Sequence, residues 1–108
     1  MKLDDSLRVS KLIDTYGKLL TNKQYEIITS YYFDNLSLSE IGDNYSISRQ
    51  AVSDSINQSI KALETFEEKL CLVKSSEEIV SDLETILSIT SDFTVTQRIN
   101  EIITKLRG

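Results

Sequence analysis

Residues 36–63 read LSLSEIGDNYSISRQAVSDSINQSIKAL, and this stretch decides the fold that the sequence predicts. Ser37 stands three residues before Glu40, which is the spacing of a capping box, so a short helix is predicted to begin near Leu38. Ser48 is an N-cap type of residue placed directly before a long apolar series, so a second helix is predicted to begin there. The few residues between the two helices allow only a sharp turn. The stretch therefore predicts a helix-turn-helix with a longer second helix.

Gly42 has a specific place in this motif. It falls where the two helices are expected to approach most closely, because a side chain at that point would hold them apart. The apolar residues expected to pack between the helices are Leu38, Ile41, Ile47, Val52 and Ile56.

A family resemblance rests on these same residues. Its most specific segments are Glu40-Ile41-Gly42, Ile47-Ser48-Arg49, Val52, Ile56 and Ala62-Leu63, which are similar to the helix-turn-helix of region four of bacterial sigma factors. Together with the flanking segments LLTNKQYEIITSYYFDNLS and SRQAVSDSINQSIKALETFEEKL, they make residues 6–73 resemble the YlxM family. Those are small bacterial proteins encoded beside signal recognition particle genes. The resemblance implies an accessory or regulatory role in the signal recognition particle pathway.

Two departures from the sigma pattern bear on function. Ser46 occupies the turn position where a glycine with positive φ is usual, so the turn is expected to be strained or of another type. The second helix of sigma-like domains carries several Lys and Arg residues, whereas this surface holds Ser53, Asp54, Ser55, Asn57, Gln58 and Ser59. The pattern supports the fold and weakens the case for DNA binding.

The rest of the chain also predicts helices. Apolar residues at steps of three and four from Leu7 indicate a helix that ends near Leu20, with acidic and capping residues at 4–6 ahead of it. Thr21 with Gln24 forms a second capping box before a central helix. The stripe of the helix that begins at Ser48 continues to Val73, and residues 75–78 are expected to separate it from two last helices. We thus expect an all-α bundle of five or six helices, with one long helix and a C-terminal helical hairpin. Residues 1–108 should form a single domain, with the helix-turn-helix core at about 6–73 and the extension at about 76–107.

Composition excludes several kinds of chemistry. The 108 residues include no histidine and one cysteine, so histidine-based catalysis and zinc sites of His or several Cys lack their parts. We expect Cys71, which is flanked by leucines, to be a small buried residue. No apolar segment is long enough to cross a membrane, and the first residues lack a leader pattern. We therefore expect a cytoplasmic protein without membrane insertion, metal or cofactor.

One hypothesis assigns nucleic-acid binding to the second helix. Ser48 and the helix N-terminus would hold a phosphate, and Arg49 and Gln50 would reach base edges or backbone. The full set of candidates is Ser48, Arg49, Gln50, Ser53, Asp54, Asn57 and Lys61. Arg49 and Gln50 can equally be ordinary surface residues of a first helical turn. The net charge of −5 also repels nucleic acid at long range.

A second hypothesis makes the same scaffold a protein-binding module. The acidic candidates on the long helix are Glu64, Glu67 and Glu68, which could meet a basic protein or a ribonucleoprotein. Such acids are often only a solvated face of a helix. The partners implied by the resemblance are the protein or the RNA of the signal recognition particle, and DNA is the alternative partner of a transcription regulator. A homodimer is a further option, because the long apolar stripe must be covered by the last two helices or by another copy.

An enzyme is the weakest hypothesis. The adjacent acids Glu67/Glu68 and Glu77/Glu78 point about 100° apart on a helix and cannot share a substrate. We therefore expect no catalysis, and a protein that acts by binding.

Overall fold

The computed structural model describes residues 3–108, and over this range it is all-α. The chain divides into two compact units, Met1–Leu70 and Cys71–Gly108. We expected one domain with an extension, and the boundary between core and extension lies at Leu70–Cys71 rather than between residues 73 and 76.

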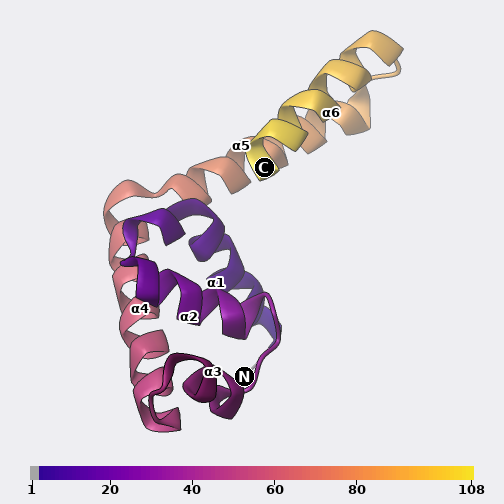
Figure 1. Ribbon diagram of the computed structural model, residues 1–108. Helices are drawn as coiled ribbons and strands as arrows, with labels where there is room; N and C mark the ends of the chain where they lie inside the picture. The colour runs from indigo at the N-terminus through magenta and orange to yellow at the C-terminus, as the bar shows by residue number, and fades with distance from the viewer. Residues whose placement is uncertain (1–2) are drawn as a thin grey trace. The chain divides into compact units, whose positions relative to one another are not determined.

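The first unit is built around one long helix. Its elements are α1 (Leu3–Tyr16), the short 3-10 helix η1 (Gly17–Leu19), α2 (Asn22–Tyr32), α3 (Leu38–Tyr45) and α4 (Arg49–Leu70). With 22 residues, α4 is about 33 Å long and contacts α1, α2 and α3 in turn (Figure 1). The short helix α3 lies at the N-terminal end of α4, where the two form the predicted helix-turn-helix.

Both predicted capping boxes are confirmed. The Thr21 hydroxyl accepts from the Gln24 backbone N–H at 3.2 Å, and the Gln24 side chain accepts from the Thr21 N–H at 3.2 Å. Ser37 and Glu40 make the same pair of bonds at 3.0 and 3.1 Å. Each box satisfies two N–H groups that a helix start leaves without intrahelical partners, which fixes where α2 and α3 begin.

The core of the first unit brings together residues from all four of its α-helices. The hydrophobic side chains that are at most 1% exposed are Leu12, Tyr16, Ile27, Ile28, Ile41, Val52 and Leu63. Within this core, Ile27, Ile41, Val52 and Ile56 form one cluster, against which Leu38 and Ile47 pack. The expected packing between the two helices of the motif is thus confirmed.

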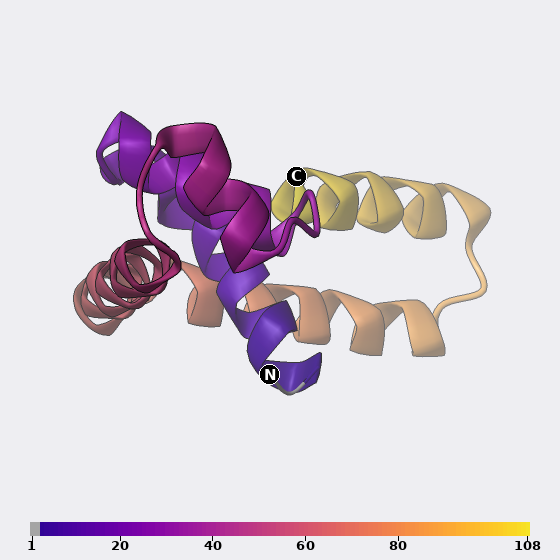
Figure 2. The ribbon, with the colours of Figure 1, turned by 60° about the horizontal axis from the view of Figure 1, so that its bottom comes forward.

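The second unit is a helical hairpin. It consists of α5 (Leu72–Ile89) and α6 (Phe93–Arg107), which run side by side in opposite directions (Figure 2). Asp92 caps α6 by accepting from the Val95 N–H at 3.1 Å. The buried residues of the seam are Val80, Ile99 and Ile103, with Leu83, Leu87 and Leu106 packed against them. Across one side of the hairpin, the Arg107 guanidinium donates to Glu84 Oε1 at 3.0 Å.

The break between the two long helices differs from the prediction. The apolar stripe predicted a helix through Val73 and a new start near residues 75–78, but α4 ends at Leu70 and α5 begins at Leu72. Cys71 separates them with a left-handed backbone at φ 54°. Its side chain is exposed, so the expectation of a buried cysteine is wrong. A single left-handed residue ends a helix without Gly or Pro, which left no signal in the sequence.

Candidate nucleic-acid interface

The turn of the motif is held by a close backbone contact. A Cβ added at Gly42 would lie 2.7 Å from the carbonyl oxygen of Ile47, so only glycine lets the end of α3 approach the turn this closely. The Ile47 N–H donates to the Gly42 oxygen at 2.9 Å. Ser46 adopts the left-handed conformation at φ 57°, which is the geometry that a glycine would favour. The turn is therefore of the usual type, with a strained serine in it.

Ser48 begins the second helix, as predicted. Its hydroxyl accepts from the Ala51 N–H at 3.0 Å, and its carbonyl accepts from the Val52 N–H at 3.0 Å. The N–H groups of Arg49 and Gln50 precede the first intrahelical bond and point out of the N-terminus of α4. With the positive end of the helix dipole, this terminus favours an anionic group such as a phosphate.

The candidate side chains form an exposed row on α4. Arg49 and Gln50 are exposed in the first turn, and Asp54, Asn57 and Lys61 continue the row from Gln50 at steps of four, three and four residues. Ser53 is partly buried beside the row. The opposite face of α4 carries the buried residues Val52, Ile56, Ser59 and Leu63. The structure thus aligns Gln50, Asp54, Asn57 and Lys61 on one exposed face of α4. Ser48 and Arg49 are exposed at the start of the helix, with Arg49 about 100° around the axis from this row.

Electrostatics limit what this surface can bind. Arg49 and Lys61 are its cations, and they lie twelve positions apart on α4, which corresponds to about 18 Å. Asp54 lies between them and accepts a hydrogen bond from the Gln50 amide at 2.9 Å. The bond orients the Gln50 side chain and occupies one of its two amide N–H groups, which leaves the other N–H and the amide oxygen for a bidentate contact with N7 and N6 of an adenine. Such a surface makes few phosphate contacts and depends on hydrogen bonding and shape.

The acidic candidates lie in three different environments. Glu64 pairs with Arg8 of α1, whose guanidinium donates to the two carboxylate oxygens at 3.1 and 2.7 Å. Glu67 is only 8% exposed and accepts from the Tyr16 hydroxyl at 2.5 Å. Glu68, in contrast, is exposed.

Glu67 therefore corrects an expectation. We expected it on a solvated acidic face, but it lies four residues after the buried Leu63, at a position that the apolar stripe assigns to the interior. The same spacing could have identified it in the sequence. A buried carboxylate needs hydrogen-bond donors, and the Tyr16 hydroxyl is one of them.

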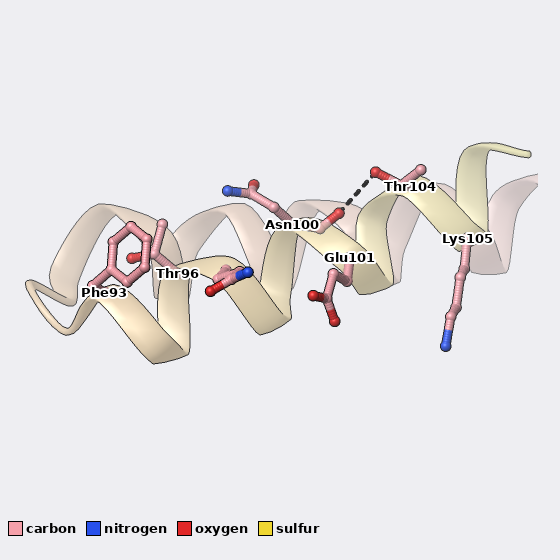
Figure 3. Close-up of a pocket in the computed structure, with 7 residues that line it drawn as sticks. Phe93, Thr96, Asn100, Glu101, Thr104 and Lys105 are labelled. Carbon is pink, nitrogen blue, oxygen red and sulfur yellow. Dashed lines mark hydrogen bonds between the residues drawn. The ribbon is translucent and has the colours of Figure 1, made fainter.

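A hollow in the second unit has few features of a ligand site. It runs along α6 from Phe93 to Lys105 and is open to solvent (Figure 3). The Thr104 hydroxyl on its wall already donates to the Asn100 carbonyl at 2.9 Å. Its lining comes from a single helix, whereas small-molecule sites are concave and gather polar groups from several elements. Within the described range, no group of three or more Cys, Asp or Glu residues is placed to hold a metal ion.

The geometry of α3 and α4 agrees with what comparison of the sequence finds. Residues 3–102 match the model of the UPF0122 family, whose description is "Putative helix-turn-helix protein, YlxM / p13 like". The chain belongs to this family. Its description names the helix-turn-helix that α3 and α4 form here.

Relatives span most of the chain. A UPF0122 protein of Bacillus pumilus is 39% identical over 106 residues, which cover 98% of this chain and 96% of the relative. The UPF0122 protein YlxM of Bacillus subtilis is 45% identical over 78 residues, covering 72% and 71%. One from Thermoanaerobacter sp. strain X514 is 48% identical over 83 residues, covering 77% and 71%. None of the helices in the described part of the chain has the length and apolar character needed to cross a membrane.

Proposed function

We propose that this protein is a non-catalytic helix-turn-helix protein that binds nucleic acid through the first turns of α4, and that it is an accessory component or regulator of the signal recognition particle pathway. Its nucleic-acid partner in this proposal is the RNA of the particle. The observation that carries the binding role is the exposure of the capped α4 start, where Ser48, Arg49 and Gln50 face solvent together.

The acidic hypothesis lost support from the structure. Glu67 is inside the first unit and Glu64 is paired with Arg8, so two of the three acids have structural roles. A partner that bound through these acids would have to compete with the packing of α1 on α4. The exposed row from Gln50 to Lys61 lies on the face of α4 away from its buried residues, and the bond between Gln50 and Asp54 on it is itself exposed.

The family resemblance supplies the pathway, and charge supports the choice of partner. A surface with two cations neutralises few phosphates and gains little non-specific affinity for duplex DNA. A folded RNA offers unpaired bases, 2′-hydroxyls and a defined shape, which hydrogen-bonding side chains such as Gln50 and Asn57 can contact. This protein would therefore recognise a particular RNA rather than coat nucleic acid in general.

Fluorescence anisotropy with labelled signal recognition particle RNA tests the proposal. We expect Arg49→Ala to weaken binding by about tenfold or more, since one lost charged contact to nucleic acid costs about 1–3 kcal/mol. The slope of log K against log salt should also fall by about one unit for each cation removed. Lys23→Ala is the matched control, because Lys23 is an exposed cation on α2, outside the row, and its loss should change neither quantity.

Binding to the protein of the signal recognition particle, measured in the same assay, tests a protein-mediated role. Glu68→Lys is the variant for this test, because Glu68 is the exposed member of the three acidic candidates. Binding to that protein alone, lost with Glu68→Lys and retained with Arg49→Ala, would contradict nucleic-acid recognition through α4.

A DNA-binding transcription regulator is the second candidate. The exposed row from Gln50 to Lys61 favours it, because a recognition helix reads the major groove with such a row. Specific duplexes recovered by selection from random DNA should then bind more tightly than the particle RNA, and the tighter binding should depend on Gln50 and Asn57. A selection that enriches no DNA sequence would count against a DNA-binding transcription regulator.

A further inference from the structure

The hairpin of the second unit has an apolar side that faces solvent. On α5, Ile79 and Ile86 lie seven residues apart and are 46% and 42% exposed. On α6, Val95 and Ile102 also lie seven residues apart and are 38% and 43% exposed. Ile79, Ile86 and Ile102 each stand one residue before a residue of the seam, namely Val80, Leu87 and Ile103. Seven-residue spacing on two helices is the pattern of a helix-packing surface.

These four residues lie on the same side of the hairpin. A residue that precedes a seam position is rotated about 100° back around its helix axis. In an antiparallel pair, equal rotations on both helices lead to one side of the pair. The bond between Glu84 and Arg107 verifies this geometry, because each follows a seam residue and they meet on one side at 3.0 Å. The residues that precede seam positions therefore meet on the opposite side.

A two-helix unit of this size needs a cover for that side. Its seam contains three buried residues, and each is still 7–8% exposed. Units shorter than about 40 residues seldom bury enough apolar surface without a disulfide, a metal or a further chain. Residues 71–108 contain a single cysteine, so a disulfide within the unit is excluded.

The charges on the apolar side indicate what covers it. Asp82 on α5 precedes the seam residue Leu83, while Arg98 and Lys105 on α6 precede Ile99 and Leu106. Arg98 is paired with Glu101 of its own helix at 3.7 Å, so Asp82 on α5 and Lys105 on α6 are the opposite charges that the two halves of this side present. A two-fold axis parallel to the helices would lay α5 of one copy over α6 of the other, so that Asp82 meets Lys105 twice. The surface is complementary to itself in apolar residues and in charge.

We propose that the side formed by Ile79, Ile86, Val95 and Ile102 is the interface of a homodimer, in which two hairpins form a four-helix bundle. Two-fold packing of helical hairpins is a common way to close such a seam. The exposed large apolar residues of the first unit do not offer an equivalent row, since they are spread over α1, η1, α2, the residue that follows α2, and the end of α4. They are Leu7, Leu19, Tyr25, Phe33 and Leu70. The dimer is independent of what α4 binds.

Sedimentation equilibrium of the full chain tests the interface. The protein should be a dimer, and Ile102→Glu should raise the dissociation constant by about 100-fold or more, because it would bury an unpaired carboxylate. Asn100→Glu is the matched control, because it adds the same charge to α6 on the polar side and should leave the dimer intact. Circular dichroism establishes that each variant remains helical.

A charge exchange tests the proposed orientation even if Ile102→Glu unfolds the hairpin. Asp82→Lys should weaken the dimer by about tenfold, and adding Lys105→Asp to the same chain should restore it. A monomeric protein would overturn the proposal, and so would a folded Ile102→Glu variant that dimerises normally.

Discussion

The two units are built from the same kind of helix but reach different degrees of closure. In the first unit, residues from four helices surround a core whose central side chains are at most 1% exposed. In the second unit, two helices share one seam whose buried residues keep 7–8% of their surface exposed. Four helices can surround a buried side chain on all sides, whereas two helices leave part of it open to solvent. The comparison indicates that the first unit carries its own stability and that the second depends on a partner.

Matched truncations in the two cores test this contrast most strongly. Ile41→Ala should lower the free energy of unfolding of the first unit by about 3–4 kcal/mol, because Ile41 is fully buried between α2, α3 and α4. Ile103→Ala should cost less, about 1–2 kcal/mol, because its site is more open and can relax. Native-state hydrogen exchange measures both units in one experiment. Equal losses of unfolding free energy in the two variants would contradict the difference in closure between the two units.

A second test compares the two helical glycines. Gly42→Ala should lower stability by about 2 kcal/mol, because its Cβ would lie 2.7 Å from a backbone oxygen that belongs to the turn. Gly17→Ala should cost much less. Its Cβ would approach the ring of Tyr25 at 2.8 Å, and that ring is 37% exposed and can turn away. Urea unfolding followed by circular dichroism gives both values, and a neutral Gly42→Ala would refute the close approach.

The buried carboxylate gives a smaller effect in the first unit. Tyr16→Phe removes the hydroxyl that donates to Glu67 and should lower stability by about 1.5 kcal/mol. Glu67→Gln keeps an oxygen that can accept this bond and removes the charge, so it should be better tolerated than Glu67→Ala. Unfolding in urea at neutral pH measures the three variants. An unchanged midpoint for Tyr16→Phe would show that other groups support Glu67.

Replacing Ser59 should give the smallest change in stability, and this change should be an increase. Its hydroxyl oxygen is buried and has no hydrogen-bond partner among the residues that the structure describes. Ser59→Ala removes this polar group and should raise stability by about 0.5–1 kcal/mol. Differential scanning calorimetry should show a higher melting temperature. A lower one would mean that the hydroxyl has a partner in solution, such as a bound water.

Local signals in the sequence predicted much of the first unit. The capping boxes at Thr21 and Ser37 fixed the starts of α2 and α3, because a side chain three residues away satisfies the first N–H groups. Gly42 predicted the close approach, since only a missing side chain permits it. Most of the binding candidates on α4 are exposed because the apolar residues of this helix define its other face, and Ser53, expected on the outward face, is partly buried. The role of these candidates in binding stays a prediction.

Tertiary effects limited the rest. The end of α4 was placed too late because the apolar stripe continues to Val73, while the chain turns at Cys71 with no Gly or Pro to mark it. Glu67 was placed on the surface by its charge, although its spacing from Leu63 assigns it to the buried face. At this position the charge favours exposure and the helical spacing favours burial. The Tyr16 hydroxyl, 51 residues away in the sequence, donates a hydrogen bond to the buried carboxylate.

Mapping of amide chemical shifts on addition of the signal recognition particle RNA tests the central claim most directly. We predict that the largest changes fall on the exposed row of α4, from Ser48 to Lys61, and that they disappear with Arg49→Ala. Changes that are largest in α5 and α6, with residues 48–61 unaffected, would contradict recognition through the helix-turn-helix.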